Sequence, residues 1–255
     1  MNRKEDFIAV FDSGVGGISV LRHLTALMPG ERFLYYGDSA NAPYGTRPKE
    51  EVRGLTFAVV EKLMARGLKA LVVACNTATS AAIDALRETW PELIIVGIEP
   101  AVKLACDRFP GGTIGVMATE MTLREGKFSE LMHRFDGGER ILRLPAPGLV
   151  ELVEQGRGNS PEASALLEPI LGPWRGKLDA LVLGCTHYPF ASRAISRVLG
   201  PDTPLMDGGE GTARETLRRL REAGLLENGE GALLIENSTG DPGLTALSRQ
   251  LLGDL

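Results

Sequence analysis

Short apolar runs alternate with amphipathic segments along the whole chain, which predicts alternating strands and helices. The first run, residues 8–11, is continuous and β-rich, as in a strand covered on both faces of a parallel sheet. Apolar residues at helical spacing follow over 18–27, and Pro29 and Gly30 end that helix. The same reasoning predicts strands at 33–36, 70–74, 93–98, 113–117, 140–144, 178–183 and 232–236, and helices at 50–66, 79–88, 101–109, 123–133, 161–171, 190–199, 212–223 and 243–252, with a loop entering a helix at 147–156.

Two strand–loop units recur in the same order. Residues 8–13 resemble residues 114–119 at an offset of 106, and residues 70–77 resemble residues 180–187 at an offset of 110. We therefore expect an α/β fold of two similar lobes, each a mostly parallel sheet flanked by helices, with the active site in the cleft between them. The first lobe is predicted to comprise residues 1–98 and 208–255, and the second residues 99–207, so that the tail after Asp207 returns to the first lobe.

Composition narrows the class of protein. The 255 residues carry 28 Lys and Arg against 33 Asp and Glu, a net charge of −5, so the basic patch of a nucleic-acid binder is not expected. No apolar run approaches the ~18 residues of a membrane span, and the first residues lack the apolar core of an export signal. With only three cysteines, we expect a cytoplasmic protein without disulfides.

Two of the three cysteines occupy matching places in the repeat. Cys75 and Cys185 each end an apolar strand and precede small polar residues, where open α/β sheets bind ligands. A thiol at the start of a helix is expected to have a lowered pKa. Facing each other across a cleft, one thiolate could remove a proton from a carbon while the opposite thiol returns one, which inverts that carbon. Cys106 is expected to be structural.

Two other uses of these thiols remain open. A redox disulfide is one, but the sequence has no C-x-x-C spacing. A zinc site formed by Cys75, Cys185 and His187 is the other, although the closely spaced ligand pairs of structural zinc sites are absent. His187 follows Cys185 by two positions, so an extended backbone would place both side chains on one side. It could act in acid–base chemistry or lower the pKa of the thiol.

Further polar residues cluster near other strand ends. Asp12 and Ser13 precede a glycine-rich turn, where Asp12 could hold a substrate ammonium group or cap the following helix. The loop over 39–48 contains two prolines and Tyr44, and is either a rigid connector or part of a site. Glu151 and Glu154 share one helix face, which is a solvated face by default.

Several of these segments carry a family resemblance. They are Phe-Asp-Ser-Gly-Val-Gly-Gly (11–17), Tyr-Gly-Asp (36–38), Pro-Tyr-Gly (43–45), Ala-Cys-Asn-Thr-Ala (74–78), Ala-Thr (118–119) and Gly-Cys-Thr-His-Tyr-Pro (184–189). Together they make the sequence similar, nearly end to end, to the glutamate racemases of the cofactor-independent aspartate/glutamate racemase superfamily.

The resemblance implies roles for individual residues. Cys75 and Cys185 would be the acid/base thiols, assisted by Asp12 and His187, with no cofactor and no metal. Asp38 and Glu154 match acidic positions of the family and are secondary candidates. The substrate contacts would be Asp12, Ser13, Pro43, Tyr44, Gly45, Asn76, Thr77, Thr119, Thr186 and His187.

The resemblance also implies a substrate, an oligomeric state and a role in the cell, and two other functions remain open. It implies glutamate as substrate, a homodimer, and supply of D-glutamate for peptidoglycan. Many relatives have cysteine where this chain has Ala146, a difference expected to affect only local packing. The short segment before Ile8 leads us to expect no activation by a cell-wall precursor. The alternatives are a racemase for aspartate or another amino acid, and a two-lobe binding module that clamps an amino acid without turnover.

Overall fold

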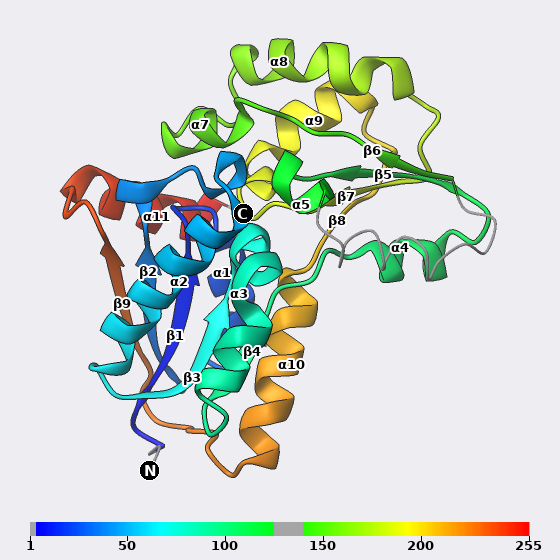
Figure 1. The fold of residues 1–255 in the computed structure, drawn as a ribbon. Coiled ribbons are helices and arrows are strands. Elements are labelled where there is room, and N and C mark those ends of the chain that lie inside the picture. Colours follow the sequence, from blue (N-terminus) through cyan, green and yellow to red (C-terminus); the bar gives the residue numbers. More distant parts are fainter. Residues whose placement is uncertain (1–3, 125–139, 255) are drawn as a thin grey trace.

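The fold consists of two parallel sheets, each in its own lobe, in a computed structural model that describes residues 4–124 and 140–254 (Figure 1). The first sheet has the order β4-β3-β1-β2-β9 and the second the order β6-β5-β7-β8. All described pairings are parallel. The strands are β1 (Phe7–Asp12), β2 (Arg32–Gly37), β3 (Leu68–Val73), β4 (Ile94–Gly97), β5 (Thr113–Met117), β6 (Arg140–Arg143), β7 (Ala180–Leu183), β8 (Leu205–Asp207) and β9 (Ala232–Asn237).

The two sheets repeat one another, which confirms the prediction of two similar lobes. The order β4-β3-β1-β2 in the first sheet corresponds to β8-β7-β5-β6 in the second, and β9 extends the first sheet at its β2 edge. The pairing register repeats as well. Ile8 lies beside Ala70 in the first sheet, and Ile114 lies beside Ala180 in the second. The offsets of 106 and 110 in the sequence therefore align the same pair of strands in each lobe.

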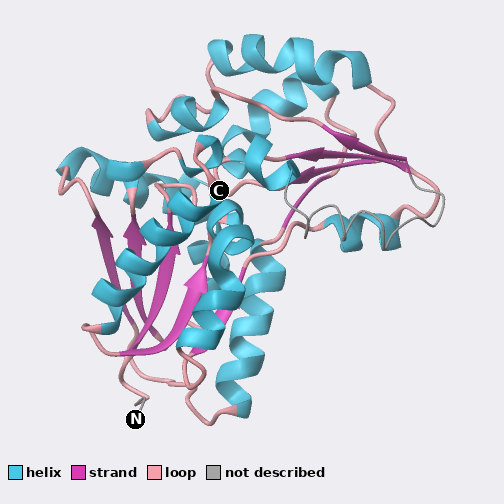
Figure 2. Ribbon diagram, in the orientation of Figure 1, coloured by secondary structure: helices cyan, strands magenta, loops and turns pink. Residues whose placement is uncertain are grey.

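Helices cover both faces of each sheet, as buried parallel strands require (Figure 2). On the first sheet, one face packs against α1 (Ile18–Leu27), α10 (Gly209–Glu222) and α11 (Pro242–Asp254), and the other against α2 (Lys49–Met64) and α3 (Asn76–Thr89). On the second, the corresponding helices are α7 (Leu149–Glu154), α8 (Pro161–Leu171) and α9 (Ser192–Leu199) on one face, and α4 (Val102–Arg108) and α5 (Glu120–Arg124) on the other.

Strand side chains alternate between these faces because successive residues of a strand point to opposite sides. In β1, Ile8 and Val10 join the cluster under α1, while Ala9 and Phe11 join the cluster under α2. The cluster under α1 continues into the second lobe through residues such as Leu149 of α7. The two lobes consequently share one hydrophobic core on this side.

Several elements differ from the sequence prediction, among them α10, which begins at Gly209 and not at residue 212. Strand β8 was not predicted, because its three residues are too short to show a period. Helix α3 begins at Asn76, directly after Cys75, and not at residue 79. Helix α5 covers the start of the helix predicted over 123–133, and the rest of that prediction, with His133, lies outside the described residues.

The tail after the second lobe packs on the first. Strand β9 pairs with β2 throughout its length, and α11 packs on the face that also holds α1. The division of the chain into lobes at residues 98/99 and 207/208 stays a prediction. None of the described helices combines the length and the apolar character needed to cross a membrane.

A buried ion pair also fastens this tail, at the end of the first sheet opposite the cleft. Lys69 Nζ lies 2.6 Å from Glu31 Oε2, and both side chains are fully buried. The same ammonium group donates to the carbonyl oxygen atoms of Lys4 and Leu225. The backbone N–H of Glu227 donates to Glu31 Oε1 at 2.8 Å. One pair therefore joins the start of the chain, β3 and the segment that leads into β9.

Candidate active site

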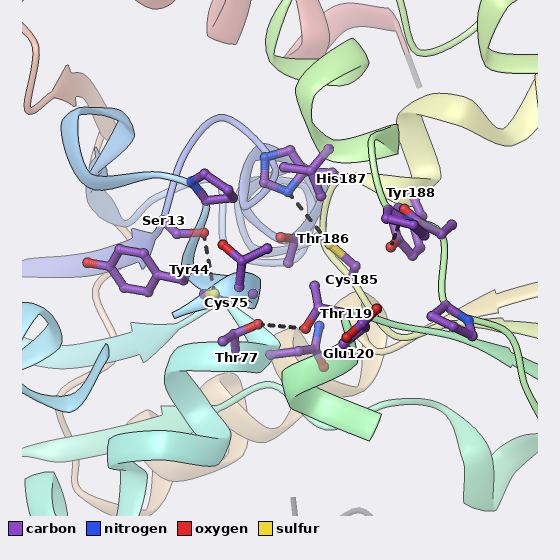
Figure 3. Close-up of a pocket in the computed structure, with 18 of the residues that line it drawn as sticks. Ser13, Tyr44, Cys75, Thr77, Thr119, Glu120, Cys185, Thr186, His187 and Tyr188 are labelled. Carbon is purple, nitrogen blue, oxygen red and sulfur yellow. Dashed lines mark hydrogen bonds between the residues drawn. The ribbon is translucent and has the colours of Figure 1, made fainter. Parts of the chain in front are cut away.

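A cavity of about 250 Å³ lies between the lobes, at the ends of the strands where the sequence predicted a site (Figure 3). Eleven of the predicted site residues line it: Ser13, Pro43, Tyr44, Gly45, Cys75, Asn76, Thr77, Thr119, Cys185, Thr186 and His187. They come from four strand ends and one loop, and from both lobes. The cavity therefore brings together segments up to 174 residues apart, such as the two whose Asp12 and Thr186 side chains are hydrogen-bonded.

Sequence reasoning missed other residues that line this cavity. They are Thr46, Glu120, Pro145, Ala146, Pro147, Gly148, Val150, Glu151 and Tyr188. Residues 145–148 directly follow β6, so the rule that ligands bind beyond the carboxyl ends of strands could have found them. Because Ala146 lines the cavity, the expectation that this position affects only local packing is wrong. Glu151 also lines the cavity and is not simply part of a solvated face.

Three of the predicted site residues do not line the cavity but are hydrogen-bonded to residues that do. They are the acidic residues Asp12, Asp38 and Glu154. Thr186 Oγ1 donates to Asp12 Oδ2 at 2.9 Å. The Tyr44 hydroxyl donates to Asp38 Oδ2 at 2.7 Å. Glu154 Oε1 lies 2.6 Å from His187 Nε2. Each carboxylate thus fixes the orientation of one polar side chain in the cavity.

Cys75 occupies the cap position of α3, so its environment is set by that helix and by the end of β3. The Ala78 N–H donates to its Sγ at 3.4 Å, and the thiol donates to Ser13 Oγ at 3.5 Å. Burial nevertheless raises the pKa of Cys75 to about 12, and the charge of Asp12 acts in the same direction. The expected lowering by the helix start is therefore wrong, because loss of hydration outweighs the hydrogen bonds with Ser13 and Ala78.

Cys185 has a different partner, the imidazole of His187. Nδ1 of His187 lies 3.7 Å from Cys185 Sγ (Figure 3). The backbone of His187 is helical, with φ −75° and ψ −29°, so a turn places the ring near the thiol and not the extended segment that the sequence suggested. The role expected for His187, in acid–base chemistry or in lowering the pKa of the thiol, stays a prediction.

His187 and Glu154 form a buried pair. Burial alone lowers the pKa of His187, but the hydrogen bonds and charges of Cys185 and Glu154 outweigh it and hold the pKa well above its usual value. Burial alone raises the pKa of Glu154, but the hydrogen bond and charge of His187 outweigh it and lower the pKa. The raised pKa of His187 and the lowered pKa of Glu154 both favour an imidazolium that faces a carboxylate. This imidazolium lies beside Cys185.

The glycine-rich turn after β1 allows His187 and Glu154 of the second lobe to lie close to the first lobe. A side chain at Gly14 would overlap the Glu154 carboxylate, and one at Gly16 would overlap the His187 ring. The Val15 N–H donates to Glu154 Oε1 at 2.8 Å. The alternative that Asp12 caps α1 is wrong, because that helix has no side-chain cap and Asp12 Oδ1 accepts instead from the Gly14 N–H.

The kinds of polar group that line the cavity limit the ligands that it can bind. No described residue that lines it is Lys or Arg, and its polar groups are hydroxyls, amides, thiols, the His187 ring and two carboxylates at Glu120 and Glu151. Asn76 Oδ1 is buried there without a hydrogen-bond partner, although buried polar atoms are normally paired. An acceptor of this kind fits a ligand that brings its own N–H donors. The described residues contain no group of three or more His, Cys, Asp or Glu suited to a metal ion.

One thiol from each lobe on a single cavity suits inversion at a carbon, because it offers an acid/base group on each side of a bound substrate, and the fold and site together are those of a two-lobe α/β racemase. Residues 17–216 match the family model described as Asp/Glu/Hydantoin racemase, and the chain belongs to this family.

Its relatives agree with that assignment. The chain is 46% identical, over 99% of both chains, to a glutamate racemase of Clostridium botulinum. It resembles the crystal structure of a glutamate racemase isoform from Bacillus anthracis at 32% identity with a TM-score of 0.87, which covers 98% of this chain and 95% of that one. It also resembles the Escherichia coli glutamate racemase in complex with L-glutamate and the activator UDP-MurNAc-ala, at 30% identity with a TM-score of 0.80, over 91% of this chain and 98% of that one.

Proposed function

We propose that the protein is a glutamate racemase that interconverts L- and D-glutamate by proton transfer at Cα. The observation that carries the proposal is the position of Cys75 and Cys185, which come from equivalent strand ends of opposite lobes and line the same cavity. The names of the relatives, at 46% and 47% identity over nearly the full chain, support glutamate over aspartate as the substrate.

The proposed reaction uses the two thiols in exchangeable roles. One cysteine thiolate takes the α-proton, so the C–H bond breaks and an S–H bond forms. The opposite thiol then gives its proton to the other face of the carbanion, so its S–H bond breaks and a new C–H bond forms. The enzyme ends with the proton on the opposite cysteine, and the reverse reaction starts from that state. The two proton equilibria are coupled and belong to the pair.

The neighbouring residues have supporting roles in this proposal. His187 and Asp12 assist proton transfer, Asp12 through the hydroxyl of Thr186. Neutral donors in a cavity with little water can stabilise charge that develops on the substrate carboxylate. We assign substrate contact to the predicted lining residues, with Asn76 Oδ1 as an acceptor for the substrate ammonium group. Asp38 and Glu154 orient Tyr44 and His187.

The wider context follows from the same proposal. D-Glutamate made by this reaction would serve peptidoglycan synthesis in the cytoplasm. We also expect a homodimer, which light scattering of the purified protein would test. We expect no bound cofactor to be needed, and no nucleic-acid or membrane partner.

The test is an assay of the purified protein with each glutamate enantiomer and no added cofactor. Circular dichroism should show both solutions converging on the racemate. In deuterated water, the product enantiomer should carry deuterium at Cα, because the returned proton comes from a thiol that exchanges with solvent. Tight binding of glutamate without inversion or isotope exchange would instead identify a binding module. Turnover of aspartate but not glutamate would identify a different racemase.

A further inference from the structure

Three threonine hydroxyls meet where α3 of the first lobe approaches α5 of the second. Thr77 Oγ1 lies 3.2 Å from Thr119 Oγ1 and 3.4 Å from Thr122 Oγ1. The Thr119 hydroxyl donates to Thr122 Oγ1 at 3.0 Å. Thr77 and Thr119 line the cavity, and Figure 3 shows their contact. Thr122 is only 2% exposed and lies behind them, outside the lining.

The number of protons in this cluster limits what it can bind. Each hydroxyl has one proton to donate and two lone pairs that accept. In a closed ring, each threonine donates to the next, and all three protons stay inside the cluster. A substrate carboxylate only accepts hydrogen bonds. Thr77 and Thr119 can both donate to it only if both protons turn towards the cavity, which would leave their oxygen atoms 3.2 Å apart with no proton between them.

Thr122 can donate a hydrogen bond to both of these oxygen atoms at once, in place of the missing proton between them. Its backbone N–H donates to Thr119 Oγ1 at 3.3 Å, and its hydroxyl lies within hydrogen-bonding distance of Thr77 Oγ1. One residue thus offers a separate donor to each of the two lining hydroxyls. No charged side chain is needed, which suits a cavity whose described lining has no Lys or Arg.

We infer that Thr122 is a positioning residue for substrate binding, whose N–H and hydroxyl engage Thr119 and Thr77 so that both hydroxyls donate to a substrate carboxylate. The inference rests on the proposed function, because it assigns a carboxylate to this part of the cavity. Thr122 belongs to the second lobe and Thr77 to the first, so the arrangement exists only when the lobes are together. Its effect should fall on binding of the substrate in both the ground state and the transition state.

Thr122→Val tests this inference, because valine has nearly the shape of threonine, keeps the backbone N–H and lacks the hydroxyl. Thr77 must then donate to Thr119 and loses its bond to the carboxylate. KM for both enantiomers should rise about tenfold, the order expected for one hydrogen bond to a charged group. The value of kcat should change by less than about twofold, since lost uniform binding raises KM alone. Thr122→Ser restores the hydroxyl and should return KM towards that of the unmodified enzyme.

Thr56→Val is the matched control. Thr56 is fully buried in α2, and its hydroxyl donates to the Val52 carbonyl oxygen at 2.7 Å, away from the cavity. The substitution removes the same hydroxyl group from a buried threonine, so the Thr56→Val variant should be less stable but should have an unchanged KM. The inference is overturned if Thr122→Val leaves KM unchanged, if Thr56→Val raises KM equally, or if Thr122→Ser fails to restore it. If the unmodified protein does not racemise glutamate, the proposed function fails instead, and the role of Thr122 with it.

Discussion

The two cysteines stand at equivalent points of a repeated scaffold, yet their surroundings differ. Cys75 is bordered by neutral groups, the Ser13 hydroxyl and the Ala78 N–H, with the Asp12 carboxylate near enough to oppose ionisation. Cys185 is bordered by His187, whose raised pKa and pairing with Glu154 favour a positive charge. The repeat supplies the opposed positions of the two thiols, while positions at which its two copies differ, such as His187 where the first copy has Thr77, determine the charge around each one.

This difference has a chemical consequence. The raised pKa of Cys75 favours a neutral thiol there, whereas the neighbour of Cys185 is an imidazole whose own pKa is raised. A pair with one thiol and one thiolate is what the proposed reaction needs before either enantiomer binds. The two directions of the reaction start from opposite protonation states of this pair, so the different surroundings of the two cysteines affect them differently.

The largest expected effect comes from removing either thiol. Cys75→Ser and Cys185→Ser should each lower racemisation by about 10³-fold, because a serine hydroxyl is far too weak an acid to replace a general acid or base. Proton exchange with deuterated water, followed by mass spectrometry, should survive for one enantiomer only, and for opposite enantiomers in the two variants. Exchange of the same enantiomer in both variants would contradict thiols on opposite faces of the substrate. Cys106→Ser, a buried change away from the cavity, is the control and should leave turnover unchanged.

A second comparison lies at the far ends of the two sheets. Lys69 and Asp179 occupy the same register position of the repeat, next to Ala70 and Ala180. Lys69 is fully buried and paired with Glu31, whereas Asp179 is exposed and accepts from the Thr113 N–H. The first lobe therefore depends on a buried charge pair where the second uses a solvated carboxylate, because only the first lobe must hold the returning tail.

Lys69→Met should consequently lower the free energy of unfolding by about 3–5 kcal/mol, because it leaves the Glu31 carboxylate buried without its partner. Urea unfolding followed by circular dichroism measures this. Asp179→Asn, the matched change in the second lobe, should cost less than about 1 kcal/mol because water reaches the site. Adding Glu31→Leu to Lys69→Met should recover part of the loss, since the unpaired charge is then gone. Equal losses in both single variants would show that the lobes do not differ in this way.

Sequence reasoning predicted the scaffold better than the electrostatics. Residues 8–13 and 70–77 predicted the repeat, because buried parallel strands have a distinctive apolar pattern, and the structure adds that the repeated strands pair in the same register. Sequence reasoning could not predict that Glu154 pairs with His187, since 33 residues and the direction of α7 separate them. It gave the wrong direction for the pKa of Cys75, because the local helix start is visible in the sequence and the depth of burial is not.

The smallest of these effects concerns Glu154→Gln, which keeps the size of the side chain and removes its charge. His187 then loses one of the two groups that raise its pKa, so the pKa should fall. If the His187 imidazolium assists proton transfer at Cys185, turnover declines as pH rises through the pKa of His187. That decline should begin at lower pH in the variant, because the Glu154 charge no longer holds the proton on the imidazole, so the variant should lose turnover relative to the unmodified enzyme on the alkaline limb.

Profiles of kcat against pH for both enantiomers distinguish this role from simple loss of structure. Destabilisation would lower turnover by a similar factor at every pH, whereas loss of the charge pair moves the alkaline limb alone. Glu168→Gln removes an exposed carboxylate of α8 and should leave the limb in place. The pair also contributes stability above the usual glutamate pKa of 4.5, and loses it as pH rises through the raised pKa of His187. An unmoved limb in Glu154→Gln would show that the two cysteines differ in their neighbours but not in how those neighbours control charge.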